Sequence, residues 1–455
     1  MRITGTNIYS LLHCSHAVAL DLHEPRSKRR SVTELEEFIR KRGRDWEDQF
    51  VAGLRGYKEP EFDRGDFESG ADQTLTFMRD GVEGVTQAVL IEDARLGIPD
   101  LLRREPGDSD FGDYHYVVGD IKSSGRPRSD QVLQVAFYSR MLARLQGRDP
   151  EYGYLILKTG EEHRFALSDY SAVIEEVEET ILKLAGDASE SRPFFNRGCR
   201  GCHWSEVCIP QMQDSDDLSL LEGMTRGVRT TLEQRGFDSC GSLRSMLVDS
   251  ESKATHLEPA LLRRLKQGAQ ARESGEAVRQ DRSPQPDLEG AAVIHHLYDA
   301  FSERLLYVGA QFPALPEGQV FAECPQDKSE EARLFAKVIE QLPPGAPILH
   351  YSEALPRWYS ESEGASVDVE MRFVDLARRA RGVAVYQGPV YGLAEHVQYL
   401  LGLDPHREGE ADAAAMWNSR GEAEEWLRNK GRSDLEDLCG VLDAVLGESS
   451  TGGSV

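Results

Sequence analysis

The chain has 455 residues, which is enough for two or three domains with their own hydrophobic cores. It is 40% hydrophobic and 29% charged, as expected of a globular protein. It lacks a run of roughly 18 apolar residues that could span a membrane, and it lacks a signal-peptide pattern. We therefore predict a cytoplasmic protein. The formal net charge of −25 repels phosphate backbones, which leaves two interpretations. Either nucleic-acid binding is confined to local basic patches, or nucleic acid is not the ligand. We favour the first.

The first half of the chain is predicted to alternate helices with short strands. Residues 31–57 should form a helix that is capped by Ser31, with Glu34 completing a capping box. The β-favouring stretches that follow are 74–78, 85–93, 96–105 and 114–124. The next expected elements are a helix over 129–147, a strand pair over 151–160 and 163–168, and a helix over 168–186.

The second half is predicted to contain a helical module, a linker and a further α/β domain. The module covers 213–272 and the linker, which is polar and carries two prolines, covers 273–288. The α/β domain covers 289–447. Its expected elements are strands at 291–301, 304–312 and 346–352, and helices at 329–342, 367–382, 391–402 and 434–447. Residues 447–455 are expected to be disordered.

One set of acidic residues and a lysine has the composition that phosphodiester hydrolysis requires. Asp120 and Lys122 are two residues apart on a predicted strand, so their side chains share one face. Asp100, in "GIPD", supplies a second carboxylate from a neighbouring strand. Carboxylates and carbonyls bind hard divalent cations, which polarise a phosphate and activate water. Glu47 and the carbonyl of Ile121 are further candidate ligands, and Lys122 is suited to orienting the water or stabilising charge on the phosphorane.

The order of Glu47, "GIPDLL", "GDIKSS" and "QVAFY" resembles the PD-(D/E)XK nucleases of the RecB-like branch. The resemblance covers about residues 1–210. It implies a restriction-endonuclease-like α/β core, Mg²⁺ or Mn²⁺ at Asp100 and Asp120, and Lys122 as the catalytic lysine. It also implies that Gln134 and Tyr138 form a helix motif near the DNA. Trp46 stands where many relatives carry a His near the metal site, so this chain has no histidine ligand at that position.

Four cysteines bracket this set. They are Cys14 near the start of the chain and Cys199, Cys202 and Cys208 after the core, and they resemble those of the iron–sulfur members of the same branch, the CRISPR adaptation nucleases and AddB-type repair nucleases. The resemblance implies a 4Fe–4S cluster. Four thiolates also hold structural Zn²⁺, although the lopsided spacing differs from two CxxC knuckles.

The remaining modules carry two further resemblances. The segment around Gly223 and Gly227 is similar to a helix-hairpin-helix, in which Arg226 and Arg229 would add charge toward a phosphate; a simple helical spacer is an equal alternative. The C-terminal domain resembles RNase H-like exonuclease domains. Active members carry a D-x-E on the first strand, where this chain has His295, His296 and Leu297, although Asp375 and Asp437 fit later acidic positions. We therefore expect an inactive domain that serves DNA or partner binding.

Together these patterns predict a metal-dependent deoxyribonuclease, an exonuclease or a single-strand and end-processing enzyme, in DNA repair, recombination or defence against foreign DNA. The alternative is a non-catalytic DNA-binding subunit that works with a helicase or another nuclease. A scaffold with zinc at its cysteines is a third hypothesis.

Overall fold

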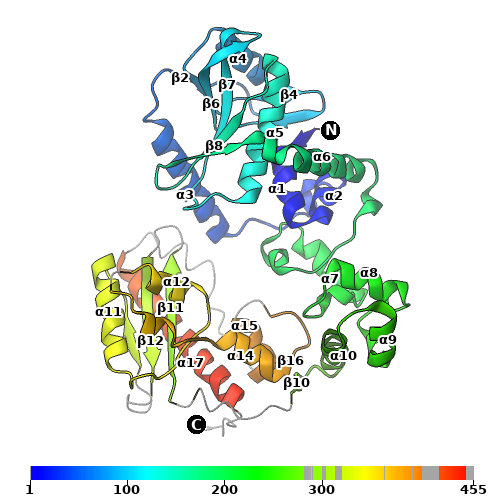
Figure 1. Ribbon diagram of the computed structural model, residues 1–455, viewed down its shortest axis with the longest axis vertical. Helices are drawn as coiled ribbons and strands as arrows, with labels where there is room; N and C mark the ends of the chain where they lie inside the picture. Colours follow the sequence, from blue (N-terminus) through cyan, green and yellow to red (C-terminus); the bar gives the residue numbers. More distant parts are fainter. Residues whose placement is uncertain are drawn as a thin grey trace. The chain divides into compact units, whose positions relative to one another are not determined.

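The computed structural model describes residues 2–280, 288, 290–299, 304–312, 320–362, 364–390, 393–401 and 420–446 (Figure 1). The chain divides into two compact units. The N-terminal unit comprises Met1–Phe194 with Gly198–Ile209, and the C-terminal unit comprises Phe195–Arg197 with Pro210–Val455. None of the helices in the described part of the chain is long and apolar enough to cross a membrane. The predicted disordered tail, 447–455, lies outside the described residues.

The N-terminal unit is built on a six-stranded sheet of order β2-β3-β6-β7-β8-β9, with a smaller sheet of order β1-β5-β4. Its strands are β1 (Ile3–Thr4), β2 (Tyr57–Lys58), β3 (Gly84–Thr86), β4 (Leu90–Glu92), β5 (Arg95–Gly97), β6 (Leu101–Ser109), β7 (Gly112–Ile121), β8 (Tyr152–Ile156) and β9 (Glu162–Ala166). Its helices are α1 (Gly5–His13), α2 (Ser15–His23), α3 (Glu34–Val51), α4 (Phe67–Arg79), α5 (Ser129–Gln146) and α6 (Ser171–Gly186), and α7 (Ser205–Asp214) carries the boundary to the next unit.

Helices cover both faces of the large sheet because the side chains of β7 alternate between them. Tyr116 and Val118 are buried in the main core, together with residues of α5 such as Phe137. Val117 and Ile121 belong to a second cluster, against which Trp46 and other apolar residues of α3 pack. The end of β7 is therefore enclosed between α3 and α5, and this placement matters for the site.

One strand prediction and one helix prediction in this unit need correction. Residues 74–78 lie in α4 and not in a strand, and Thr74 bonds its hydroxyl to the carbonyl of Gly70 one turn earlier. The helix predicted over 31–57 is shorter at both ends. Its cap is Thr33, which accepts from the Glu36 amide while the Glu36 side chain accepts from the Thr33 amide. The helix over 129–147 is confirmed by α5, which ends at Gly147 with φ 65°. The strand pair at β8 and β9 is also confirmed.

The C-terminal unit begins with short helices and continues as an α/β domain. Its helices are α8 (Arg226–Gln234), α9 (Val248–Thr255), α10 (Pro259–Ser274), α11 (Lys328–Glu340), α12 (Ala354–Ser360), α13 (Val367–Glu370), α14 (Leu376–Val383), α15 (Leu393–His396), which continues as a π-helical turn over Val397–Leu401, and α17 (Arg420–Leu446). Its strands are β10 (Val278–Arg279), β11 (Ala292–Asp299), β12 (Arg304–Gln311), β13 (Phe321–Glu323), β14 (Ile348–His350), β15 (Phe373–Asp375) and β16 (Ala384–Val385).

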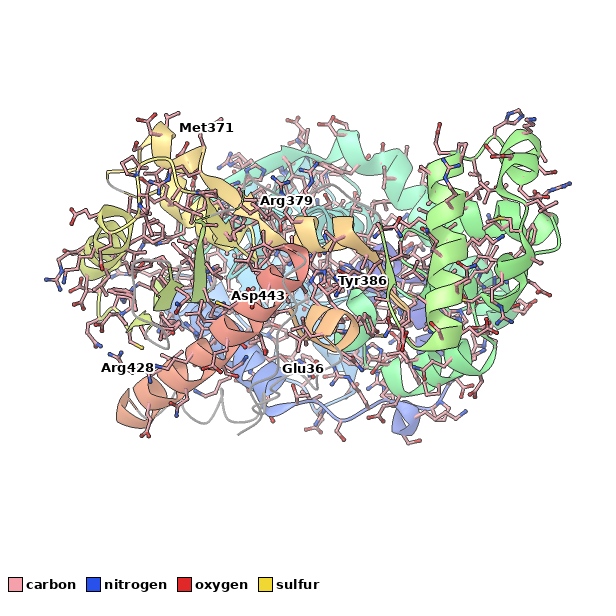
Figure 2. All side chains as sticks on the ribbon, turned by 90° about the horizontal axis from the view of Figure 1, so that it is seen from below. Glu36, Met371, Arg379, Tyr386, Arg428 and Asp443 are labelled. Carbon is pink, nitrogen blue, oxygen red and sulfur yellow. The ribbon has the colours of Figure 1, made fainter. Side chains whose placement is uncertain are left out.

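The main sheet of this unit has the order β13-β12-β11-β14-β15. The pairs of β11 with β12 and of β12 with β13 are antiparallel, whereas β14 and β15 run parallel to β11. Ile294 packs in a cluster with Phe335 of α11, and its neighbour Val293 packs in another with Leu438 of α17. Helices therefore cover both faces. Arg428 and Asp443, both on α17, are labelled in Figure 2.

Several predictions in this unit are corrected. The helix predicted over 367–382 is interrupted by β15, and the helix predicted to start at 434 begins at Arg420. Part of the predicted linker is structured, because β10 pairs antiparallel with β16. The strands predicted over 291–301 and 304–312 are confirmed as the antiparallel pair β11–β12, within the described residues.

Candidate functional site

Antiparallel pairing of β6 and β7 brings the two predicted strand acids together. Leu101 is opposite Gly119, so Asp100, immediately before β6, lies beside Asp120 near the end of β7. Gly119 is required at this point, because an added Cβ would lie 2.2 Å from the ring of Tyr154. An overlap of that size forces the neighbour to move.

Lys122 lies between the two carboxylates. Its Nζ is 2.5 Å from Asp120 Oδ2 and 3.7 Å from Asp100 Oδ2. The backbone amide of Ile121 donates to Asp100 Oδ2 at 2.8 Å, which fixes the orientation of that carboxylate. The structure therefore brings Asp100, Asp120 and Lys122 into one cluster, with Ile121 supplying an amide contact to it.

Burial and mutual repulsion set the electrostatics of this cluster. Burial, followed by the charge of Asp120, raises the pKa of Asp100 well above its usual range. Burial alone would lower the pKa of Lys122, but the Asp120 and Asp100 carboxylates outweigh it and raise that pKa. Lys122 is thus a cation at neutral pH. A proton on Asp100 leaves one carboxylate balanced by one ammonium, and a bound cation would favour the ionised form of Asp100 in place of that proton.

Glu47 reaches this cluster through a residue that sequence reasoning missed. Gln87 Nε2 donates to Glu47 Oε1 and, at 3.2 Å, to Asp100 Oδ1. The Gln87 backbone has φ 47°, in the left-handed region that non-glycine residues seldom adopt. Its amide also donates to the Asp100 carbonyl at 3.0 Å. No sequence pattern marked this position, because Gln87 follows β3 without a turn signal.

Gln134 and Tyr138 form a pair on α5. Gln134 Nε2 donates to the Tyr138 hydroxyl at 2.9 Å. The Tyr138 ring lies against Gly5 and Gly97, where an added Cβ would come within 2.2 Å and 2.6 Å of ring or hydroxyl atoms. Burial, followed by the Asp120 charge, raises the pKa of Tyr138. Within the described residues, no hydrogen bond joins this pair to Asp100, Asp120 or Lys122.

The cluster has the chemistry of a site for a hard cation, but its third carboxylate stands apart. Asp120 Oδ2 is buried and lies 2.5 Å from the Lys122 ammonium, so a metal ion bound there would share this oxygen with Lys122. Across the described ranges, no three His, Cys, Asp or Glu side chains converge closely enough to hold a metal ion. The Gln87 amide bridges Glu47 and Asp100 by donating to both carboxylates.

The four predicted cysteine ligands all belong to the N-terminal unit, and none forms a disulfide. Burial, followed by the charges of Cys202, Cys14 and Cys199, raises the pKa of Cys208 to about 12. The pKa of Cys202 is raised by burial and by Cys14. The four thiols are therefore neighbours that act on one another electrostatically, without converging at metal-ligand distances in the described residues.

Two residues that the sequence did not single out fix the cysteine segment. Asp21 Oδ1, on α2, accepts from Trp204 Nε1 at 2.7 Å and lies 2.8 Å from His203 Nε2. Arg30 donates to the carbonyls of Gly201 and Cys202 at 2.9 and 3.1 Å. Trp204 is fully buried. These contacts join residues near position 20 to residues near position 200 and keep Cys14 beside the other three.

Only one of the two arginines predicted to contact phosphate in the helical module is exposed to solvent. Arg229 is only 4% exposed at its side chain and is paired with Asp217 at 3.1 Å and Glu233 at 3.2 Å. Its guanidinium is thus neutralised inside the protein, so the predicted phosphate contact by Arg229 is wrong. Gly223 does occupy a left-handed turn, with φ 89°. Arg226 is exposed at the start of α8.

A cavity of about 220 Å³ lies over β11 and β14 in the C-terminal unit. It is lined by His295, His296, Tyr351, Ser352, Leu393, Ala394, Lys430, Asp434 and Asp437. Asp434 pairs with Lys430 and, at 3.2 Å, with His295 Nε2. Of the two later acids expected here, Asp437 lines the cavity, whereas Asp375 caps α14 by accepting from the Arg378 amide at 3.0 Å.

Residues 14–209 match the PD-(D/E)XK nuclease superfamily. The match covers the described cluster and all four cysteines of the N-terminal unit. No curated protein matches the sequence. The N-terminal unit therefore contains a PD-(D/E)XK nuclease superfamily domain, which carries the expectation of a metal-dependent nuclease with a nucleic-acid substrate.

The Gln87 bridge gives a prediction for metal affinity. Gln87→Gly keeps the left-handed backbone but removes the amide that orients Glu47 and Asp100. We expect the concentration of Mn²⁺ needed for half-maximal activity to rise by about 10-fold, as is typical when partners of metal ligands are lost. Titration of the cleavage rate against Mn²⁺ measures this. Gln73→Ala, which removes a half-buried glutamine of α4 bonded to Glu61, serves as the control. Equal Mn²⁺ dependence in all three proteins contradicts a role for Gln87.

The cavity of the C-terminal unit gives a prediction for pH. Burial, followed by His295 and His350, lowers the pKa of His296 to about 3, against about 6.5 in an unfolded chain. The unfolded state therefore binds the extra proton between these values. The stability contributed by neutral His296 is complete above pH 6.5 and falls as the pH drops toward 3. His296→Gln should reduce the stability lost between pH 7 and pH 5 by about 2 kcal/mol, as measured by urea unfolding. An unchanged pH dependence would show that His296 is protonated without cost.

Proposed function

We propose that the N-terminal unit hydrolyses phosphodiester bonds of DNA with Mg²⁺ or Mn²⁺, and that it acts on single strands or ends in repair, recombination or defence against foreign DNA. The observation that carries this proposal is the cluster of Asp100, Asp120 and Lys122 at the end of β7. The superfamily match over 14–209 supports the reaction class.

In the proposed mechanism, each residue has a distinct role. Asp100 and Asp120 would hold the divalent ion, with Glu47 and the Ile121 carbonyl as further ligands. When bound, the ion would supply charge neutralisation at the phosphate and lower the pKa of a bound water. Lys122, held by Asp120, stays protonated and is placed to orient that water and to offset charge on the phosphorane oxygens. Gln134 would line the adjacent wall near the nucleic acid, and the buried Tyr138, whose hydroxyl accepts from Gln134, would hold it in position.

The proposal predicts the effect of removing either partner of the Lys122–Asp120 pair. Asp120→Ala and Lys122→Ala should each lower the cleavage rate at least 100-fold, because they remove a metal ligand and a charge-stabilising group respectively. The assay uses end-labelled single-stranded and duplex DNA with Mn²⁺ or Mg²⁺. Asp113→Ala, at the exposed opposite end of β7, is the control and should retain full activity.

Undiminished cleavage by folded Asp120→Ala and Lys122→Ala proteins contradicts the assignment. Absence of cleavage in the unmodified protein, with DNA binding retained, favours the second candidate function. That candidate is a non-catalytic DNA-binding subunit that works with a helicase or another nuclease. The net charge of −25 and the separation of Glu47 from the two aspartates are the observations in its favour.

We further propose that Cys14, Cys199, Cys202 and Cys208 hold a 4Fe–4S cluster. The support is their mutual proximity in one unit and the anchoring of their segment by Asp21 and Arg30. Such a cluster would tie the start of the chain to the end of the nuclease domain. Zinc in the same ligands would serve the same structural role.

Metal analysis distinguishes iron from zinc. Protein purified without oxygen should contain roughly four iron atoms per chain and a broad visible absorbance. Cys208→Ala should lose both and unfold at a lower temperature. Cys240→Ala, which removes a buried thiol of the other unit, should keep them. One zinc per chain without iron would contradict the cluster.

We propose that the C-terminal unit contains an RNase H-like domain without catalytic activity, which binds DNA or a partner protein. Its sheet, an antiparallel β11–β12–β13 meander extended by parallel β14 and β15, has the order of RNase H-like domains and supports this. His295 and His296 stand on β11 where active members carry carboxylates. Lys430 forms an ion pair with Asp434 and so competes with a metal ion for this carboxylate, which supports the loss of metal catalysis there.

A further inference from the structure

One helix of the nuclease domain is fixed at both ends and uncovered between them. At its C-terminal end, α3 packs Trp46, Phe50 and Val51 against the sheet. At its N-terminal end, Arg30 binds Glu36 and, at the same time, the carbonyls of the cysteine segment. Figure 2 labels Glu36 on this helix. Fixing both ends holds the stretch between them at a defined place relative to Glu47.

The uncovered stretch continues the face of α3 that carries Glu47. At 3.6 residues per turn, Arg40 and Arg44 lie within about 60° of Glu47 around the helix axis. Both arginines are exposed, and a Cβ added to Gly43 would meet nothing within 4 Å. Ile39, on the same side, is 60% exposed. An apolar side chain and two arginines therefore face open space beside the site.

The charge of this region is opposite to that of the chain as a whole. Residues 26–44 contain eight Lys or Arg and three Glu, whereas the whole chain carries −25. A protein with that overall charge repels phosphate backbones, so a polyanion can approach only along a local basic path. Arg44 and Arg40 lie about 4.5 and 10 Å along the helix from Glu47, the scale of successive phosphates in a nucleic-acid strand.

We infer that the exposed face of α3 formed by Ile39, Arg40, Gly43 and Arg44 is a track for the phosphate backbone of a nucleic-acid strand leading to the Asp100–Asp120–Lys122 cluster. The two guanidiniums contact phosphates that neighbour the scissile one, and Ile39 contacts a sugar or base. This inference rests on the proposed function, since it assigns the substrate path to that same site.

The same helix offers a matched control. Lys41 is also exposed, but it lies about 120° around the helix from Glu47 and pairs with Asp45 at 3.3 Å. Reversal of its charge changes the net charge of α3 as much as reversal of one arginine does. It leaves the proposed track intact, so it separates a local contact from the general electrostatic field.

The experiment measures binding apart from cleavage. A fluorescein-labelled single-stranded oligonucleotide is titrated with the full-length protein in EDTA, and anisotropy is recorded at several salt concentrations. Arg40→Glu/Arg44→Glu should weaken binding at least 10-fold and reduce the slope of log K against log salt by about 1.4, two phosphate contacts' worth. Lys41→Glu should bind within 2-fold of the unmodified protein. Arg40→Lys/Arg44→Lys should recover most of the affinity, and thermal unfolding checks that all variants are folded.

Steady-state cleavage then separates this inference from the proposed function. The Glu double variant should raise KM with little change in kcat, because the arginines bind neighbouring phosphates equally in the ground state and the transition state. Normal cleavage with unchanged affinity and KM in that variant overturns the track and leaves the nuclease assignment standing. An equal loss in Lys41→Glu also overturns it, as does a changed oligomeric state without a change in binding. If the unmodified protein neither binds nor cleaves DNA, both the track and the proposed function fail.

Discussion

The contact between Lys122 and the two carboxylates at the end of β7 is the interaction on which the rest of the nuclease domain depends. Buried charges are costly unless they are paired, and here two acids share one ammonium. Two local features hold this pair of carboxylates in place. The Ile121 amide donates to Asp100 and orients it, and Gly119 lets the Tyr154 ring lie close against the strand. The cluster remains one positive charge short of neutrality when both aspartates ionise. This deficit is what makes the arrangement suited to a divalent cation.

The supporting structure around this cluster comes from segments far apart in the chain. Gln87 connects Glu47 on α3 to Asp100 before β6. Asp21 and Arg30 connect the start of the chain to the cysteine segment. Because Arg30 also binds Glu36, one side chain holds both the cysteine segment and the start of α3. Loosening of the cysteine segment would therefore free the helix that carries both Glu47 and the uncovered arginines.

The C-terminal unit illustrates how a site changes character when its charged groups change. Asp434 is matched by Lys430 and His295, so its carboxylate is already neutralised by the protein. Burial keeps His296 neutral, because its lowered pKa lies far below physiological pH. Of the two later acids of the expected pattern, Asp437 lines the cavity and Asp375 caps a helix. This cavity therefore combines a paired carboxylate with a neutral imidazole.

The amino-acid sequence by itself determined the local pattern: the α5 helix with its polar start and Gly147 stop, the β8–β9 pair, the β11–β12 pair, and the placement of Asp120 and Lys122 on one strand face. These follow from periodicities and residue preferences that act over a few positions. The sequence pattern predicted a strand at 74–78, because the residues there favour β-structure, but packing of α4 overrules that preference. It predicted one helix over 367–382, because β15 forms only through pairing with β14. Only the tertiary structure decided that Gln87 bridges Glu47 and Asp100, that Asp21 anchors Trp204, and that Arg229 is buried. Each of these depends on partners between 4 and 183 positions away, whose approach is set by how the sheet and helices pack and not by any neighbouring residue.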